Sequence, residues 1–176
     1  MSEQTKILVV DDDEVVRLSY QRSLQAARYN AEGAMSGEDA LEALEHRPFD
    51  VVLLDLRMPG MDGMSVLKAI KRSWPKSEVV VITGYPTVES AKEAVKLGAY
   101  DYLAKPVGPA EVINATSGAI TQKKWALRKD LTSPDAGAGA ASYWTNMQRR
   151  WLGPASPDAN ADATIDPKGE SSRLVS

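Results

Sequence analysis

Short apolar segments alternate with longer amphipathic segments five times along the first three quarters of this chain. We expect strands at four apolar segments, 6–10, 51–54, 78–83 and 100–104, and at the less apolar segment 29–35. An amphipathic segment with helical spacing follows each of them, and the last one begins near Pro109. Strands that alternate with helices form a parallel sheet with helices on both faces. The sequence therefore predicts an α/β fold with a doubly wound, five-stranded parallel sheet.

The third expected strand ends in a carboxylate. Val51–Leu54 is apolar throughout, which is typical of a strand buried on both faces, and Asp55 follows it before a loop containing Pro59 and Gly60. Open α/β sheets carry their reactive groups at this carboxyl edge. A single carboxylate there is more often a helix cap or a turn residue than a nucleophile, so the other strand ends decide its role.

Three further strand ends carry polar groups. The first strand runs into four consecutive acids, beginning with Asp11 and Asp12, the fourth ends at Thr83, and the fifth leads into Lys105. Acids at a helix start complement its partial positive charge, which explains one or two of the four. In a parallel sheet these strand ends meet at one edge.

The expected cluster is chemically coherent. Three neighbouring carboxylates repel one another unless a cation lies among them, and an all-oxygen set of ligands suits Mg²⁺. Beside the metal, Asp55 stays ionised and can attack phosphorus to give an aspartyl phosphate. The Lys105 ammonium and the Thr83 hydroxyl can then meet the charge that develops on the phosphoryl oxygens.

These residues occur in ordered motifs over about residues 5–122: Val9-Val10-Asp11-Asp12, Asp55 with Met58-Pro59 and Met61-Asp62-Gly63, Ile82-Thr83-Gly84, and Lys105-Pro106. Together they resemble the receiver domain of bacterial two-component response regulators. The resemblance implies a flavodoxin-like, chemotaxis-regulator-like fold with strand order 2-1-3-4-5. It also implies that Asp55 accepts a phosphoryl group from a sensor histidine kinase or a phosphotransfer protein.

The resemblance further implies roles around Asp55. Asp12 would bind Mg²⁺ directly and Asp11 through water, with Asp55 and the backbone carbonyl of Arg57 as the remaining ligands. Asp13 would belong to the helix start, because in the family pattern the acidic pair directly follows the strand. Thr83 would move toward the phosphoryl group, and Tyr102 would turn into the space that it leaves. Tyr102 as a plain core or surface aromatic is the competing interpretation.

The resemblance implies three more features. Pro106 would follow a cis peptide bond that aims Lys105 into the site. Arg57 and Tyr85 lie where the family tunes access of water, and their bulk suggests slow hydrolysis of the phosphoryl group. The fourth helix, fifth strand and fifth helix would form the face that responds to phosphorylation, which also allows a homodimer through it.

The composition changes after the receiver-like region, so we divide the chain into five parts. They are a receiver over 1–122, an extension of the last helix over 123–130, a flexible linker over 131–142, a short amphipathic helix over 143–152 and a disordered tail over 153–176. Trp144, Met147 and Trp151 have helical spacing, so this helix either docks on an unknown downstream protein or folds back on the receiver.

The composition disfavours several classes of function. The net charge of -3 disfavours nonspecific DNA binding, and the absence of cysteine excludes disulfides and thiolate sites. No apolar run approaches the ~18 residues of a membrane span, and no signal peptide is apparent, so we expect a cytoplasmic protein. Nothing after Asp130 suggests a helix-turn-helix or an ATPase module. We therefore expect a stand-alone response regulator, a signalling phosphoacceptor rather than a conventional enzyme, without direct contact to nucleic acid.

Two other protein classes match this sequence less well. A phosphatase of the haloacid dehalogenase type would use Asp11 as nucleophile, with Asp13, Thr83 and a later lysine as partial matches. That pattern lacks the acidic metal motif after the lysine and leaves Asp55 unexplained. A dinucleotide-binding domain fails because no glycine-rich turn follows the first strand.

Overall fold

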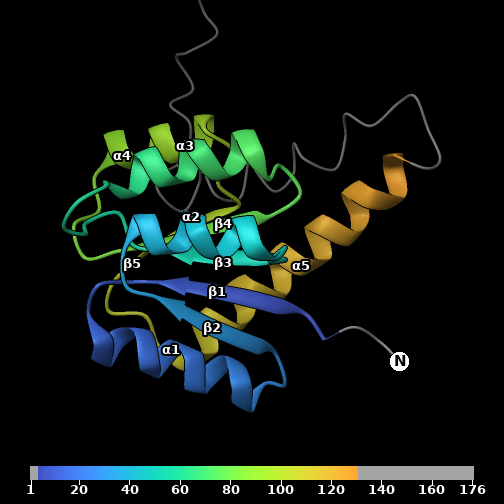
Figure 1. Ribbon diagram of the computed structural model, residues 1–176, viewed down its shortest axis with the longest axis horizontal. Helices are drawn as coiled ribbons and strands as arrows, with labels where there is room; N and C mark the ends of the chain where they lie inside the picture. Colours follow the sequence, from blue (N-terminus) through green and yellow to red (C-terminus); the bar gives the residue numbers. More distant parts are fainter. Residues whose placement is uncertain (1–3, 131–176) are drawn as a thin grey trace, which may run out of the picture.

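The computed structural model describes residues 4–130, which form a three-layered α/β domain (Figure 1). Its five parallel strands lie in the order β2-β1-β3-β4-β5, as the family resemblance implied. The strands are β1 Lys6–Val10, β2 Asn30–Ala34, β3 Val51–Leu54, β4 Glu78–Thr83 and β5 Asp101–Ala104. The helices are α1 Glu14–Ala26, α2 Gly37–His46, α3 Gly63–Ser73, α4 Val88–Lys96 and α5 Pro109–Asp130. The linker, short helix and tail predicted beyond Asp130 lie outside the described residues.

The sheet separates two hydrophobic cores. Successive strand residues face opposite sides, so Ile7 and Val9 pack beneath α1 and α5, whereas Leu8 and Val10 pack beneath α2, α3 and α4. Figure 1 shows the same division, with α1 and α5 on one side of the sheet and the other three helices opposite. Because both faces are covered, β3 is buried along its whole length, which explains its uniformly apolar sequence.

The register of the parallel strands brings their carboxyl ends together. Val10 at the end of β1 pairs with Leu54 at the end of β3, and the Asp55 amide donates to the Val10 carbonyl at 2.9 Å. Leu54 in turn pairs with Val81 of β4. The residues that follow β1 and β3, Asp11 and Asp55, therefore leave the sheet side by side.

Side-chain caps begin four of the helices. Asp13 accepts from two amides at the start of α1, Ser36 caps α2, Asp62 caps α3, and Thr87 forms a capping box with Ser90 at α4. Asp13 is thus engaged at the helix start, the role that the family resemblance implied for it. The four loops that lead into these helices are consequently each held by a side-chain hydrogen bond.

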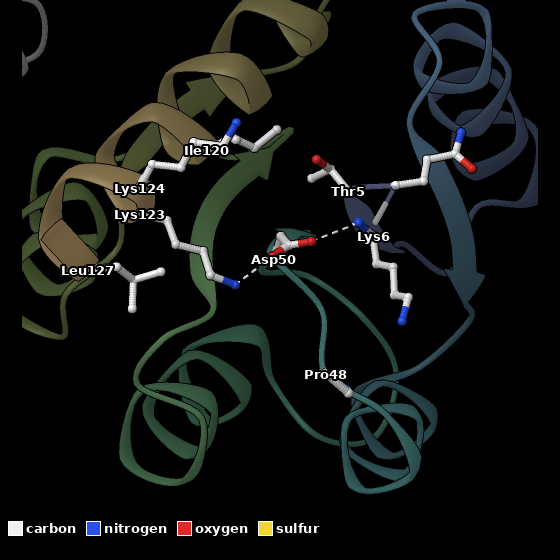
Figure 2. A pocket seen from close by; sticks show the side chains of 9 residues that line it. Thr5, Lys6, Pro48, Asp50, Ile120, Lys123, Lys124 and Leu127 are labelled. Atoms are coloured by element: carbon white, nitrogen blue, oxygen red, sulfur yellow. Dashed lines mark hydrogen bonds and ion pairs between the residues drawn. The ribbon is translucent and has the colours of Figure 1, made fainter. Parts of the chain in front are cut away.

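The opposite, amino edge of the sheet is joined to α5 through Asp50. Its two carboxylate oxygens accept from the Lys6 amide at 2.8 Å and from the Lys123 ammonium at 2.6 Å (Figure 2). A cavity of about 380 Å³ lies beside these contacts, with Ile120 and Leu127 among its lining residues. No helix within residues 4–130 combines the length and the apolar character that crossing a membrane requires.

Candidate functional site

Three carboxylates converge at the carboxyl edge of the sheet. Asp11, Asp12 and Asp55 each offer an oxygen, and these oxygens all lie within 4.8 Å of one another. Asp11 and Asp55 are 2% and 6% exposed, whereas Asp12 is open to solvent. Within residues 4–130 this is the only group of three or more such side chains that could hold a metal ion. Asp11 and Asp55 therefore form the buried part of the site, and solvent reaches it at Asp12.

The ammonium of Lys105 lies between two of the carboxylates. Its Nζ donates to Oδ2 of Asp11 at 2.7 Å and to Oδ2 of Asp55 at 3.0 Å. The Lys105 amide donates to the Thr83 carbonyl at 2.8 Å, and the Lys105–Pro106 peptide bond is cis. Lys105 thus joins the end of β5 to the acids that follow β1 and β3, across 94 and 50 positions of the chain.

Burial and charge shift two pKa values in this cluster. Burial raises the pKa of Asp11 more than the hydrogen bond and charge of Lys105 lower it. Burial alone would lower the pKa of Lys105, but its hydrogen bonds to Asp11 and Asp55 outweigh that effect and leave the pKa raised. The ammonium is therefore charged at neutral pH. Three carboxylate groups face a single ammonium, and this all-oxygen donor set with an excess of acidic groups suits a hard divalent cation.

The loop after β3 packs tightly around Asp55. The Arg57 amide donates to Asp55 Oδ1 at 3.1 Å. Gly60 has a φ of 82°, which favours glycine, and a Cβ at Gly63 would lie 2.4 Å from the Asp55 carbonyl oxygen. Because only glycine allows that approach, α3 begins directly against the backbone of Asp55. The glycines of this motif thus serve the position of the carboxylate rather than its chemistry.

Thr83 and Tyr102 occupy neighbouring strands next to the site. Thr83 ends β4, is fully buried, and accepts a hydrogen bond from the Tyr85 amide at 3.2 Å through its Oγ1. Tyr102 lies in the middle of β5, is also fully buried, and its hydroxyl lies 2.6 Å from that of Ser90 on α4. Tyr102 therefore points inward in this structure. The coupled movement expected of Thr83 and Tyr102 stays a prediction.

Arg57 and Tyr85 contact each other on the outer side of the site. The Arg57 guanidinium carbon lies 4.6 Å from the centroid of the Tyr85 ring, within the range of a cation–π interaction. Both side chains are exposed and follow Asp55 and Thr83 by two positions. The pair therefore connects the loop after β3 with the loop after β4.

The sequence did not reveal three contacts that support the cluster. Arg17 of α1 donates to the Asp11 carbonyl oxygen at 2.7 Å. Glu38 of α2 accepts from the Met61 amide at 3.1 Å, and Ser90 contacts Tyr102 as described above. Arg17, Glu38 and Ser90 have the spacing of ordinary surface positions along their helices. Their partners come from other elements, so sequence spacing alone carries no signal for them.

The family profile of the response regulator receiver domain matches residues 7–117. The chain belongs to this family. Residues 7–117 therefore form the receiver domain of a two-component response regulator, which is a signalling protein. Receiver domains interact with histidine kinases or phosphotransfer proteins.

Known relatives and structures agree with the receiver assignment. The transcriptional regulatory protein ZraR of Escherichia coli O157:H7 is 48% identical over 101 residues, which are 57% of this chain and 23% of that protein. The DNA-binding transcriptional regulator NtrC of Escherichia coli K12 is 38% identical over 115 residues, 65% of this chain and 24% of that protein. The receiver thus spans about a quarter of the length of these relatives.

The structure of a CheY-like receiver domain protein from Methanospirillum hungatei JF-1 superposes on this receiver with a TM-score of 0.68 at 26% identity. The match covers 70% of this chain and 98% of that one. Its extent agrees with a receiver that is followed by additional residues in the present chain.

Proposed function

We propose that Asp55 is the phosphoacceptor of this receiver and that Mg²⁺ is its cofactor. The observation that carries the proposal is the convergence of Asp11, Asp12 and Asp55 on one point, with Lys105 bonded to two of them. The excess of carboxylates over the single ammonium and the all-oxygen donors fit Mg²⁺. Asp12, which is open to solvent, would be a direct ligand, with Asp11, Asp55 and the Arg57 carbonyl completing the protein's contribution.

The reaction requires little covalent chemistry from the protein. An Asp55 oxygen forms a bond to phosphorus while the bond from phosphorus to an imidazole nitrogen of the donor phosphohistidine breaks, and the imidazole leaves with that electron pair. The Lys105 ammonium, already 3.0 Å from Asp55, stabilises charge on the transferring phosphoryl oxygens, and the Thr83 hydroxyl assists. When bound, Mg²⁺ supplies additional charge neutralisation at the same oxygens. The same groups would support later hydrolysis, so the receiver catalyses its own phosphorylation and dephosphorylation.

The consequences of phosphorylation would appear at α4, β5 and α5. Tyr102 lies in β5 and contacts Ser90 of α4, so a change near Thr83 has a short route to this face. We propose that the face mediates contacts with other proteins, including a second copy of the receiver. The predicted docking segment with Trp144, Met147 and Trp151 lies outside the described residues. ZraR and NtrC are named as transcriptional regulators, so the expectation that this chain's output is not DNA binding stays a prediction.

The phosphatase alternative has no support among the relatives and structures named above. A direct test treats the protein with a small-molecule phosphodonor and Mg²⁺ and then locates the label by mass spectrometry. We expect one label on Asp55, which Asp55→Asn abolishes, while Lys124→Ala at the opposite edge of the sheet leaves it unchanged. A label on Asp11, together with turnover of phosphomonoesters, would overturn the proposal in favour of a phosphatase.

A further inference from the structure

Arg17 connects α1 to the backbone of the acidic loop. Its Nη1 donates to the Asp11 carbonyl oxygen at 2.7 Å, and the Asp11 amide donates to the Ala34 carbonyl at 3.2 Å. The Asp11 carboxylate is held as well, because Oδ1 accepts from the Asp13 amide at 2.9 Å and Oδ2 from Lys105. Arg17 is therefore the contact that fixes the carbonyl end of Asp11, directly before Asp12.

The path of the Arg17 side chain depends on a glycine in β2. A Cβ at Gly33 would lie 3.0 Å from Cδ of Arg17 and 2.8 Å from Oε1 of Gln21. Gln21 can yield because its amide is the far end of a flexible side chain. Arg17 cannot yield as freely, since its guanidinium is hydrogen-bonded at Asp11. The missing side chain of Gly33 thus provides the room through which Arg17 reaches the loop.

We propose that Arg17 is a positioning residue for the metal site of this receiver, and that Gly33 is required for its placement. This inference rests on the proposed function, because it concerns how the chain prepares its carboxylates for Mg²⁺. By fixing the peptide between Asp11 and Asp12, Arg17 holds both acids where their oxygens converge with Asp55. Groups behind the direct ligands commonly set metal affinity in this way.

Because Arg17 is positively charged, the direction in which its replacement changes the affinity for Mg²⁺ distinguishes an electrostatic effect from a positioning role. A guanidinium close to a cation site repels the cation, so loss of its charge alone would tighten Mg²⁺ binding. Loss of its hydrogen bond to Asp11 would weaken binding, because the loop must then be ordered when the metal binds. A positioning role therefore predicts weaker binding in spite of the removed charge.

The first experiment compares Arg17→Met with Arg22→Met by calorimetric titration with Mg²⁺ in the absence of any phosphodonor. Arg22 is exposed on the same helix and carries the same charge, so its removal controls for net charge. We expect the dissociation constant for Mg²⁺ to rise about tenfold in Arg17→Met. It should stay unchanged or fall slightly in Arg22→Met.

The second experiment leaves Arg17 in the chain and removes the space that it uses. Gly33→Val suits a strand, and its branched side chain occupies the path of the Arg17 stem. We expect Mg²⁺ binding to weaken in the same direction. The double variant should bind no more weakly than Arg17→Met alone, because both changes remove the same contact.

The outcomes separate this inference from the proposed function. If the unaltered protein does not bind Mg²⁺, the proposed function itself fails. If it binds and Arg17→Met binds equally well or more tightly, only the positioning role is overturned. A fall in the free energy of unfolding without a change in the dissociation constant also overturns it, since that marks a purely structural contact. If Arg17→Met does not fold, Gly33→Val decides by the same two measurements.

Discussion

The hydroxyl oxygen of Tyr102 lies 2.6 Å from that of Ser90, and this contact joins β5 to the first turn of α4. Ser90 also belongs to the capping box of α4, in which its amide donates to Thr87 and its hydroxyl accepts from the Thr87 amide. One hydroxyl therefore serves both the start of the helix and the inward position of Tyr102. A tyrosine that turns outward must give up this contact.

Replacement of Ser90 should loosen Tyr102. We expect Ser90→Ala to reduce the free energy of unfolding by about 1–2 kcal/mol, through the weakened cap and the lost hydrogen bond. NMR of the Tyr102 ring should show exchange between inward and outward positions before any phosphorylation. Ser23→Ala is the matched control. Within the part of the chain that the structure describes, the Ser23 hydroxyl bonds only to the Ser19 carbonyl of the same helix, α1. An unchanged Tyr102 spectrum in Ser90→Ala would contradict the coupling.

Removal of Lys105 should separate metal binding from signalling. We expect Lys105→Ala to bind Mg²⁺ at least as tightly as the unaltered receiver, because the ammonium and the metal compete for oxygens of Asp11 and Asp55. Phosphorylation should no longer alter the Tyr102 signal, since the group that reports the phosphoryl charge to β5 is absent. Calorimetry and NMR on the same sample check both points. A normal Tyr102 response in this variant would count against the proposed role of Lys105.

Gly63 should tolerate no side chain. A Cβ there would lie 2.4 Å from the Asp55 carbonyl oxygen and 2.5 Å from Cα of Leu56, and neither backbone atom can move without shifting β3. We expect Gly63→Ala to destabilise the receiver by roughly 1–3 kcal/mol and to slow its phosphorylation. Gly84→Ala is the control for denaturant unfolding, because its nearest neighbour, Lys105 Cδ, lies at 3.9 Å. Equal stability of the two variants would show that α3 can retreat from Asp55.

Asp62 should make the stability of α3 depend on acid pH. The Ser65 hydroxyl and then the Ser65 and Met64 amides lower the pKa of Asp62 below its ordinary value of 3.8. A lowered folded pKa means that the ionised cap stabilises the fold above that ordinary value, and that this contribution disappears as the pH falls through the folded pKa. We expect Asp62→Ala to cost about 1 kcal/mol at pH 7 and progressively less below about pH 4.

The control for this pH dependence is Asp62→Asn, which keeps a capping oxygen without a titrating charge. Urea unfolding of the three proteins at several pH values measures the differences. A stability gap between Asp62→Ala and the unaltered receiver that stays constant down to pH 3 would show that the charge of Asp62 contributes nothing.

The sequence predicted the fold because most of the strands are marked by their own apolar runs, whereas β2, with the sequence Asn-Ala-Glu-Gly-Ala, is marked mainly by its place between two helices. Val51–Leu54 can be little other than a strand buried on both faces, and parallel pairing then places the residue after each strand at one edge. The meeting of Asp11, Asp55 and Lys105 follows from that rule alone. Helix periodicity was less informative, since Val15 of α1 is apolar yet 77% exposed. Contacts such as Arg17 with Asp11 depend on side-chain paths through space left by Gly33, which no spacing along one element encodes.

The contact between Asp50 and Lys123 has a practical consequence for the choice of expression boundaries. The family profile ends at residue 117, and a fragment cut there, or at 122, would retain every acid of the phosphorylation site. It would nevertheless lose Lys123, whose ammonium joins α5 to Asp50 in the loop before β3. Of the two donors to the Asp50 carboxylate described above, only the Lys6 amide would remain. A fragment that continues through the final turns of α5 would keep the ion pair between Lys123 and Asp50. Its melting temperature should exceed that of the shorter fragment.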